Sequence, residues 1–457
     1  MIEPLYTAAE MRTAEERHPG WPDTVSELMQ RAGSAVAEEA LRRYPRAGSF
    51  TVVCGGGANG GDGRIAAERL GDAGRRVTVV DVEKGGRLQP GDVVVDAIFG
   101  TGFAGEPRSE AAAAIAEINA SGRPVVAVDL PSGVDASTGE AAGVAVQAAV
   151  TVAFHGCKVG NVVAPGRFLC GEVVVADIGL ETLETENGVV GIDVLGLVPA
   201  KRPEDTKYTA GHVLVVGGAP GMTGAVCLAA EAALRADCGY VTVAAPRESL
   251  AIVEGRVLEA VKRPLEEALE VAARAGAVAI GPGLGRSTGV GELVRRLLGG
   301  TDAPAVVDAD ALFGLEPIER SGATVLTPHA GELARLLGRE PAWVSAHRLE
   351  AVRAAAHRFG CVVVLKGADT LIAEPGRGVL VAAHSPPSLA TAGSGDVLTG
   401  VLASFLAKGM EPRLAAAAAA TACGVAATLG PARGLVASDV VARLPEALRR
   451  TTPIDGG

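Results

Sequence analysis

Thr391-Ala-Gly-Ser-Gly-Asp-Val-Leu-Thr-Gly400 places three glycines around one carboxylate, Asp396, where an apolar helical run begins. Glycine lets the backbone approach an anion closely, and a helix start supplies free N–H groups and the positive end of the helix dipole. A carboxylate at such a site suits a proton acceptor for a hydroxyl that attacks a phosphoryl group. The alternative is an ordinary glycine-rich loop in which Asp396 is the helix N-cap.

The bulk composition indicates a globular protein of two to three domains. The chain has 457 residues, of which 48% are hydrophobic and 21% are charged. A net charge of -11 argues against a nucleic-acid partner. The seven cysteines show no C-x-x-C pair, which favours buried reduced thiols. The charged N-terminus lacks a signal peptide, and the Ala-rich run 414–429 favours a buried helix over a membrane span, so we expect a soluble cytoplasmic protein.

The first half alternates short apolar strands with helical segments, which is typical of a parallel sheet covered on both faces. A glycine loop at 55–63 follows the strand 49–54 and precedes a helix from Arg64. Two later strands end in Asp96-Ala-Ile-Phe-Gly-Thr-Gly102 and Asp129-Leu-Pro-Ser-Gly-Val-Asp135. Such strand ends meet at one edge of the sheet, where ligands bind.

Three of these strand-end residues carry hard oxygen ligands. Asn59, Asp96 and Ser132 together suit an alkali or alkaline-earth cation. Taken singly, each is explained equally well as a turn or cap residue.

Residues 1 to about 185 resemble the epimerase domain of NAD(P)H-hydrate repair proteins. The resemblance rests on Gly57-Ala-Asn-Gly-Gly-Asp-Gly63, Asp96-Ala-Ile-Phe-Gly-Thr-Gly102, Asp129-Leu-Pro-Ser-Gly133 and Phe154-His-Gly-Cys-Lys-Val-Gly160. It implies a Rossmann-like three-layer αβα domain over 1–190, with potassium bound by Asn59, Asp96 and Ser132. It also implies Asp129 as an acid/base, with Lys158 as a weaker candidate that could instead pair with phosphate.

The same resemblance implies a set of residues that hold the hydrated nicotinamide nucleotide. They are Ala58, Asn59, Gly60, Gly61, Asp62, Gly100, Thr101, Gly102, Phe103, Ala104, Gly105, Glu106 and Asp129. The family loop usually reads Asn-Asn-Gly-Gly-Asp, so Ala58 removes one side-chain amide and puts the strength of the epimerase activity in question. A related domain occurs as a non-catalytic module in RNA-decay scaffolds, and the retained Asn59, Asp62, Asp96 and Asp129 argue against that role.

The strand rhythm breaks between Leu180 and Pro203, where acidic and turn-prone residues predict a domain boundary. A second α/β series then begins, with strand-to-glycine junctions at Gly217-Gly218 and at Gly281-Pro-Gly-Leu-Gly285. The later junctions are Thr327-Pro-His-Ala-Gly-Glu332 and Lys366-Gly-Ala-Asp-Thr370. A lysine-glycine loop and a glycine loop that contains Asp396 together favour nucleotide phosphate binding with a proton acceptor. His329 is equally open to a structural role as a helix cap.

This half resembles the ribokinase-like superfamily and, within it, the ADP- or ATP-dependent NAD(P)H-hydrate dehydratases. The resemblance implies a ribokinase-like αβα domain over 200–457 and a hydrated-nucleotide site that contains Asp396. The remaining residues that it implies for that site are Ala225, Gly283, Gly285 and His329. Those that it implies for the adenine nucleotide are Lys366, Gly367, Ala368, Asp369, Thr370 and Gly395.

Together the two halves predict a bifunctional enzyme. The first would interconvert the R and S hydrates of NADH and NADPH, and the second would dehydrate the S form at the expense of ADP or ATP. Magnesium would accompany the nucleotide, although no dedicated magnesium cage is visible, and a homo-oligomer without membrane partners is expected. Two alternatives are a small-molecule kinase fused to a regulatory nucleotide-binding domain, and an NAD-dependent dehydrogenase built on Gly55, Gly57 and Gly60 with Asp81 on the ribose.

Overall fold

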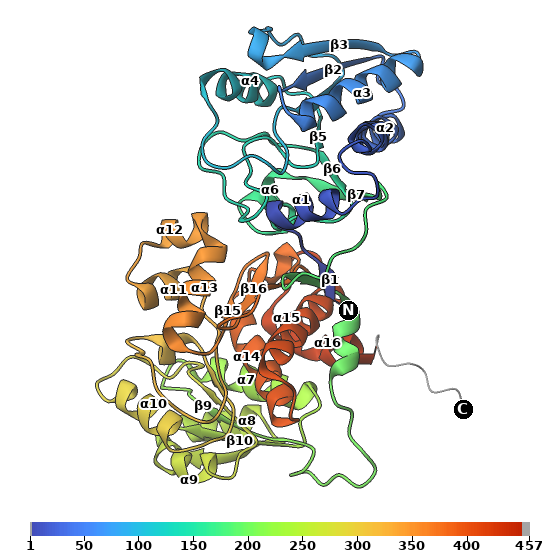
Figure 1. The fold of residues 1–457 in the computed structure, drawn as a ribbon. Coiled ribbons are helices and arrows are strands. Elements are labelled where there is room, and N and C mark those ends of the chain that lie inside the picture. The colour runs from blue at the N-terminus through green and yellow to red at the C-terminus, as the bar shows by residue number, and fades with distance from the viewer. Residues whose placement is uncertain (1, 450–457) are drawn as a thin grey trace. The chain divides into compact units, whose positions relative to one another are not determined.

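The computed structural model describes residues 2–449, and the chain forms two compact units (Figure 1). The smaller unit comprises residues 4–187 and 345–349. The described residues of the larger unit are 2–3, 188–344 and 350–449. Among residues 2–449, no helix combines the length and the apolar composition that a membrane span requires.

The smaller unit is a three-layer αβα domain around a parallel sheet of six strands in the order β3-β2-β4-β5-β6-β7. Its strands are β2 (Ser49–Cys54), β3 (Arg76–Asp81), β4 (Val93–Ala97), β5 (Val125–Val128), β6 (Val150–Phe154) and β7 (Glu172–Ala176). Its helices are α1 (Ala8–Glu16), α2 (Val25–Arg43), α3 (Ala58–Asp72), α4 (Ser109–Ala120), α5 (Val159–Val162) and α6 (Gly166–Leu169), with a 3-10 turn η1 (Val82–Lys84).

Both faces of this sheet are covered, which is why its strands are continuously apolar. Val52 and Val95 pack with α2 and α3, whereas Val53 and Val94 pack with α4 on the opposite face. The chain leaves β2 first toward β3 and then crosses to β4 on the other side of β2. In open parallel sheets, ligands bind at the carboxyl ends of the strands where the strand order reverses in this way.

The larger unit contains a mixed sheet of eleven strands in the order β1-β8-β17-β16-β15-β14-β13-β12-β9-β10-β11. Its strands are β1 (Ile2–Pro4), β8 (Gly188–Val190), β9 (His212–Val216), β10 (Tyr240–Ala245), β11 (Val261–Pro264), β12 (Ala277–Ile280), β13 (Ala305–Val307), β14 (Thr324–Leu326), β15 (Val362–Leu365), β16 (Thr370–Ala373) and β17 (Leu380–Ala382). In the order of the sheet, all strands from β15 through β12, β9 and β10 to β11 are parallel to one another. The chain builds the sheet outward from β9 to β11 and then continues with β12 on the other side of β9.

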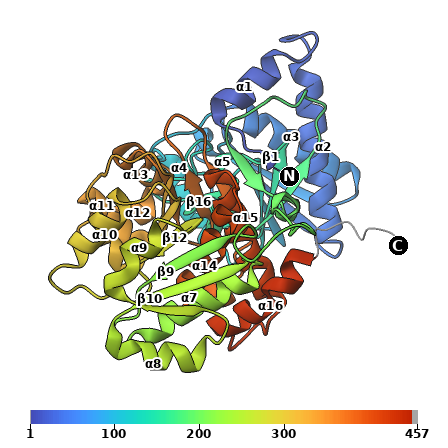
Figure 2. The same ribbon diagram turned by 90° about the horizontal axis from the view of Figure 1, so that it is seen from below.

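Helices lie on both faces of the larger sheet (Figure 2). The helices packed with the apolar core on one face are α7 (Thr223–Arg235), α8 (Arg247–Arg256), α14 (Ser394–Ala407), α15 (Pro412–Thr428) and α16 (Ala437–Arg449). The other helices are α9 (Ala268–Ala272), α10 (Val290–Gly299), α11 (Ala330–Leu337), α12 (Pro341–Ala346) and α13 (Arg348–Phe359). Four 3-10 turns complete the unit: η2 (Ile192–Leu197), η3 (Leu265–Glu267), η4 (Ala309–Leu312) and η5 (Pro387–Leu389).

The Ala-rich helix α15 is buried along almost its whole length, as its composition predicts. Alanine fits here because small side chains let a helix approach its neighbours closely, and α15 packs against α14 and α16. The sheet is mixed, because β16 pairs antiparallel with both β15 and β17. The segment from Lys366 to Asp369 is therefore the turn of a hairpin.

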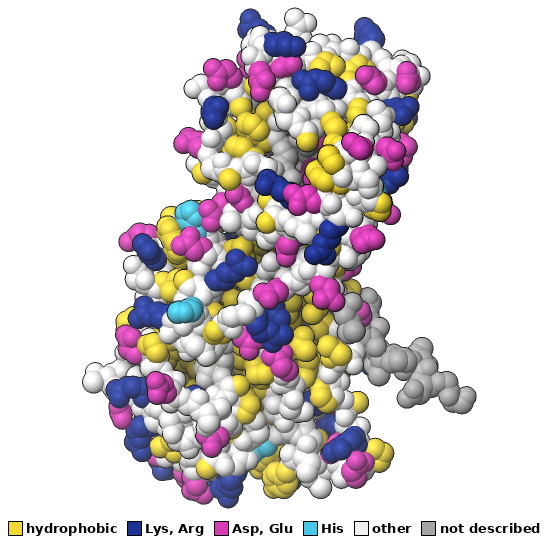
Figure 3. All heavy atoms as spheres, viewed as in Figure 1, with side chains coloured by type: hydrophobic (Ala, Val, Ile, Leu, Met, Phe, Trp, Pro, Cys, Tyr) yellow, Lys and Arg dark blue, Asp and Glu magenta, His cyan; other side chains and the backbone are white. Residues whose placement is uncertain are grey.

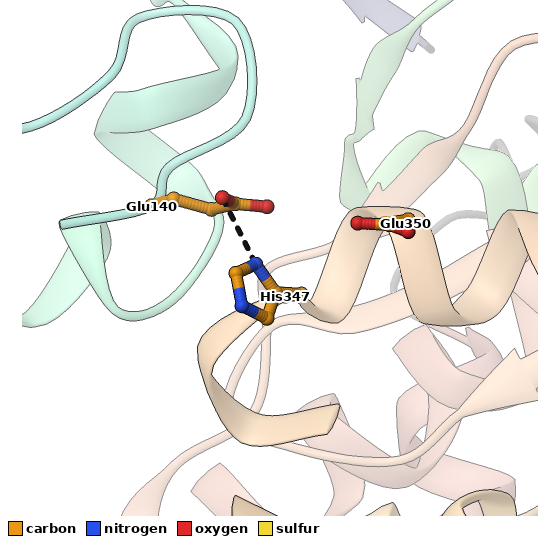
Figure 4. Close-up of side chains that lie close together, drawn as sticks. All are labelled: Glu140, His347 and Glu350. Atoms are coloured by element: carbon orange, nitrogen blue, oxygen red, sulfur yellow. Dashed lines mark ion pairs between the residues drawn. The ribbon is translucent and has the colours of Figure 1, made fainter. Parts of the chain in front are cut away.

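The surface carries both signs of charge. On the face shown in Figure 3, basic and acidic side chains are interspersed, and the described side chains of that face form no continuous basic surface. In the smaller unit, His347 Nδ1 lies 3.0 Å from a carboxylate oxygen of Glu140 (Figure 4). A partly exposed pair of this kind contributes little to stability.

Candidate active sites

The glycine run after β2 belongs to a helix, contrary to the expectation of a loop followed by a helix from Arg64. Helix α3 begins at Ala58, with Gly57 as its extended N-cap, so residues 58–62 form its first turn. A side chain at Gly60 would collide with the carbonyl of Gly55. The low helix propensity of glycine is therefore overridden by the need for close backbone approach at the sheet edge.

The predicted cation ligands Asn59, Asp96 and Ser132 come together at this edge. The Ser132 hydroxyl donates to Asp96 Oδ1 at 2.6 Å, and the Ser132 N–H donates to Asp96 Oδ2 at 2.8 Å. Asn59 Nδ2 donates to the carbonyl of Phe99 at 2.8 Å, and no donor within residues 2–449 bonds to the Asn59 amide oxygen. Among the described residues, no cationic side chain lies within 4 Å of the Asp96 carboxylate. Burial raises the pKa of Asp96 to about 6, although bonds from Ser132 lower it.

Asp129 adopts a strained backbone conformation at the end of β5. Its φ is 66°, a value that non-glycine residues rarely adopt and that concentrates at functional sites. Its carboxylate accepts hydrogen bonds from the N–H of Phe154 at 3.0 Å and from Lys158 Nζ. Lys158 is fully buried and also donates to the carbonyl of Phe154 at 2.7 Å. Lys158 is therefore bound directly to Asp129, which favours an electrostatic role at that carboxylate over a contact with phosphate.

Two further carboxyl groups share this site. Burial, together with the charges of Asp129 and Glu15, raises the pKa of Asp62 to about 8. The pKa of Glu15 on α1 is also raised, first by burial and then by Asp129. Asp62 belongs to the glycine run and was predicted to bind the nucleotide. Glu15 was missed, because a glutamate in a helix of mixed polarity carries no motif.

The other predicted nucleotide-binding residues lie on the loop after β4. A side chain at Gly100 would approach Asn59 Oδ1 to 2.9 Å, which places this loop against the first turn of α3. The rings of Phe99 and Phe103 stack at 4.6 Å. Most of the remaining loop, from Gly102 to Glu106, is exposed. The structure therefore gathers the predicted residues at one sheet edge without testing their contacts with a nucleotide.

In the larger unit, Asp396 lies in the first turn of α14. The N-cap is Gly393, with a φ of 89°, so the alternative that Asp396 is the N-cap is wrong. Burial and the neighbouring Asp308 raise the pKa of Asp396 to about 7, although Lys366 lowers it. A carboxylate with a pKa near neutral pH is well matched to general-base catalysis.

Asp308, which directly follows β13, links the turn after β15 to helix α14. Its carboxylate accepts hydrogen bonds from Lys366 Nζ at 2.7 Å and from the Thr399 hydroxyl at 2.8 Å. Lys366 Nζ also lies 3.9 Å from Glu332 Oε2. A side chain at Gly395 would approach Lys366 Nζ to 3.2 Å, so the lysine lies directly against the start of α14. Sequence reasoning gave Asp308 no role, since the partnership with Thr399 spans 91 residues.

Two predicted residues of the hydrated-nucleotide site, Ala225 and Gly283, lie side by side. A side chain at Gly283 would collide with the carbonyl of Met222 and approach Ala225 Cβ to 3.2 Å. The N–H of Gly285 donates to Asp310 Oδ2 at 2.9 Å. Gly283 and Gly285 both have positive φ, which fits glycine at these positions.

His329 is the N-cap of α11, so its structural role as a cap is confirmed. His329 Nδ1 accepts from the N–H groups of Gly331 at 3.0 Å and Glu332 at 3.3 Å. In return, Glu332 Oε2 accepts from the His329 N–H at 2.8 Å. Because Nδ1 is an acceptor, the neutral ring carries its proton on Nε2, which remains 3.5 Å from Glu332 Oε1. The contact of His329 with a nucleotide stays a prediction.

The predicted adenine-nucleotide residues 366–370 form the hairpin turn between β15 and β16. The Thr370 hydroxyl donates to the carbonyl of Gly367 at 3.0 Å and closes the turn. The side chain of Asp369 is buried, Ala368 is half-buried, and Gly367 is exposed. Gly395, the predicted residue outside this turn, lies against Lys366.

The fold and this site define the larger unit as a ribokinase-like nucleotide-binding enzyme. A family model described as NAD(P)H-hydrate dehydratase matches residues 213–449. A solved ADP/ATP-dependent NAD(P)H-hydrate dehydratase from Bacillus subtilis, co-crystallised with ATP and Mg²⁺, aligns with a TM-score of 0.53 and 29% identity. It covers 57% of this chain and 96% of its own.

The relatives that match both units together decide the family. A family model described as YjeF-related protein N-terminus matches residues 25–89 and 80–160. A bifunctional NAD(P)H-hydrate repair enzyme of Moorella thermoacetica is 38% identical over 514 residues, covering 97% of this chain and 96% of the relative. The corresponding Escherichia coli protein is 33% identical over 463 residues, with coverages of 92% and 89%. The chain belongs to the family of bifunctional NAD(P)H-hydrate repair enzymes.

Proposed function

We propose that this chain repairs NADH and NADPH hydrated at C6 of the nicotinamide ring, using one carboxylate in each of two predicted domains. Residues 1–190 epimerise the R and S hydrates, and residues 200–457 dehydrate the S hydrate at the expense of ADP or ATP. The observation that carries the proposal is Asp396, a partly buried carboxyl group with a pKa of about 7 at a helix start beside Lys366.

In the dehydratase step, the Asp396 carboxylate accepts the proton of the C6 hydroxyl. The oxygen then attacks the terminal phosphoryl group of the nucleotide, and the bond from that phosphorus to the bridging oxygen breaks. Lys366 and the N–H groups at the start of α14 stabilise the charge on the transferred group. The lone pair of the ring nitrogen expels phosphate from C6, and loss of the C5 proton restores the C5–C6 double bond. With ADP the products are the reduced dinucleotide, AMP and phosphate.

In the epimerase step, Asp129 accepts the proton of the same hydroxyl on a hydrate of either configuration. The bond from C6 to the ring nitrogen then breaks, the nitrogen takes up the proton, and the resulting aldehyde closes again on its opposite face. The ammonium of Lys158 stabilises the ionised carboxylate of Asp129. Asp62, with a pKa of about 8, is protonated at neutral pH and suits a hydrogen-bond donor to the substrate.

The cluster of Asn59, Asp96 and Ser132 fits a potassium ion. Asp96 is fully buried and lacks a cationic partner among the described side chains, and an uncompensated buried carboxylate is unfavourable. The Asn59 amide oxygen, which has no donor, adds a second hard oxygen ligand. When bound, potassium would neutralise Asp96 and hold the loop after β4 against α3.

Magnesium fits the larger unit only as an ion carried by the nucleotide. Asp308 is engaged by Lys366 and Thr399, and Asp310 is engaged by the Gly285 N–H and Arg286. These carboxylates therefore support a metal held chiefly by phosphate oxygens rather than a dedicated protein site. We favour ADP as the phosphoryl donor, and a cytoplasmic homo-oligomer belongs to the same proposal.

One assay tests the proposal against the fused small-molecule kinase. Purified R and S hydrates of NADH are incubated separately with the protein, potassium, magnesium and either ADP or ATP. Return of the reduced-nicotinamide absorbance is expected from both hydrates, with phosphate released in equal amount. A stable phosphorylated product without recovered absorbance would establish the kinase instead. Return of the absorbance from the S hydrate alone would show that residues 1–190 do not epimerise the R hydrate. The alanine at position 58 already puts this activity in question.

A further inference from the structure

Phe313 is an exposed aromatic side chain that holds two guanidinium groups. It is 54% exposed and follows η4 at the edge of the larger sheet. The guanidinium carbon of Arg286 lies 5.1 Å from the ring centroid, and that of Arg335 lies 5.9 Å from it. Each contact is a favourable cation–π interaction, but two cations gathered at one ring repel each other. The arrangement therefore favours an anion.

The three residues come from three different connections at the edge that carries the hydrated-nucleotide site. Arg286 follows Gly285, whose N–H bonds to Asp310. Arg335 lies on α11, the helix that His329 caps. Arg286, Phe313 and Arg335 line a narrow recess of about 10 Å³ together with Glu332. Glu332 in turn lies 3.9 Å from Lys366 Nζ, so the recess adjoins the phosphoryl-transfer groups.

Of the two guanidinium groups, Arg286 is paired with a carboxylate and Arg335 is available to an anion. Arg286 Nε is paired with Asp310 Oδ1 at 2.9 Å. Glu332, the nearest carboxylate to Arg335 along α11, is engaged by the His329 N–H and lies close to Lys366. Within residues 2–449, Arg335 has no carboxylate within 4 Å, and its side chain is exposed. An unpaired guanidinium beside a second one is well suited to phosphate oxygens.

We propose that Arg286, Phe313 and Arg335 form a subsite for phosphate groups of the hydrated dinucleotide, which we call the arginine clamp. The inference rests on the proposed function, because it takes the substrate of Asp396 to be a hydrated dinucleotide. That substrate carries a diphosphate and, in the NADPH form, a 2′-phosphate, both remote from the reacting C6. The clamp lies next to Gly285 and His329, whereas the predicted adenine-nucleotide residues lie on the hairpin after β15. It therefore recognises the substrate that is repaired rather than the phosphoryl donor.

Steady-state kinetics of Arg335→Ala test the clamp. The KM and kcat are measured for three substrates, the hydrates of NADPH, NADH and reduced nicotinamide riboside, which lacks phosphate. Removing one charge-assisted contact should raise the KM for the hydrated dinucleotides about tenfold and change kcat little. The KM for ADP and the kinetics with the riboside hydrate should stay unchanged. Phe313→Ala should give a smaller rise in the same KM values, because both guanidinium groups lose their support.

The matched control is Arg339→Ala. Its guanidinium carbon lies 4.9 Å from the Trp343 ring centroid, beyond the C-terminal end of α11 and outside the clamp. All KM values should stay at wild-type levels in this variant.

The outcomes separate the sources of phosphate and the two hypotheses. Equal rises for both dinucleotides assign the clamp to the diphosphate, and a rise for the NADPH hydrate alone assigns it to the 2′-phosphate. Unchanged KM values, an equal rise with the riboside hydrate, or a rise in the KM for ADP alone would each overturn the clamp while repair by the wild type stands. A wild-type protein that restores no hydrate with either nucleotide contradicts the proposed function itself.

Discussion

Asp129 and Asp396 are the two proposed proton acceptors, and both their positions in the fold and their surroundings differ. Asp129 has a strained φ of 66° and shares its carboxylate with Lys158, which is fully buried. Asp396 lies in the first turn of a long helix, where burial and Asp308 raise its pKa to about 7. Lys366, the nearest cation to Asp396, pairs with Asp308 rather than with Asp396 itself.

The difference follows from the two reactions proposed. A phosphoryl acceptor site already contains the anionic nucleotide, so a base there benefits from a raised pKa and from a lysine that is left for phosphate. The epimerase site transfers a proton and returns it, and its Asp129 carboxylate is paired with a buried lysine. Asp129 therefore has a buried lysine as its direct partner. Asp396 instead has a pKa raised by burial and by the negative charge of Asp308.

The largest expected effect separates the two carboxylates by function. Asp396→Asn should lower the kcat for dehydration by about 10²–10⁴-fold, the usual contribution of general-base catalysis, and leave epimerisation intact. Asp129→Asn should do the reverse, so that only the S hydrate is repaired quickly. Chromatographic separation of R and S hydrates over time measures both activities. Loss of both activities in either single variant would contradict the assignment of one carboxylate to each reaction.

The ion pair of Asp129 should also matter for stability. Lys158→Met leaves a buried carboxylate without its partner, and breaking a buried pair costs about 3–5 kcal/mol. Urea unfolding followed by far-UV circular dichroism should show this fall as an earlier transition, while dehydratase activity persists to the wild-type denaturant concentration. Adding Asp129→Asn to Lys158→Met should recover part of the lost stability, since the uncompensated charge is then gone. A single variant as stable as the wild type would show that the pair is not buried in solution.

The pH dependence should sharpen the contrast. Asp396 must be deprotonated to accept a proton, and its pKa is about 7. The kcat/KM for dehydration should therefore be constant above about pH 7 and fall tenfold per pH unit below it. Stopped assays from pH 5.5 to 8.5, with the hydrate supplied in its S form, measure the profile. A flat profile down to pH 5.5 would mean that the pKa of Asp396 is not raised, or that Asp396 is not the base.

The smallest expected effect concerns the hydrogen bond that joins α14 to β13. Thr399→Val removes the 2.8 Å bond to Asp308 while preserving volume, and should lower the free energy of unfolding by about 1.5 kcal/mol. The control is Thr421→Val, a buried helical threonine whose hydroxyl bonds only to the carbonyl of Ala417 in its own helix. Calorimetry of both variants measures the difference. Equal losses would show that Asp308 gains nothing specific from Thr399.

Much of the fold could be predicted from apolar strands and the glycine junctions after them. The expected strand 49–54 has the observed bounds, because continuous apolar runs need burial on both faces. The start of α3 was not predicted, because local propensity disfavours glycine in a helix.

The sequence by itself determined which polar residues stand at strand ends and helix starts, because a strand, a turn residue and a following helix are local signals. Asn59, Asp96, Ser132, Asp129 and Asp396 were all found in this way. Only the tertiary structure decided which charged groups surround these residues. Burial of Lys158 against Asp129, capture of Lys366 by Asp308 and the gathering of Arg286, Phe313 and Arg335 depend on distant segments packing together. A pKa is set by the charges and burial that packing creates, which no local pattern of residues contains.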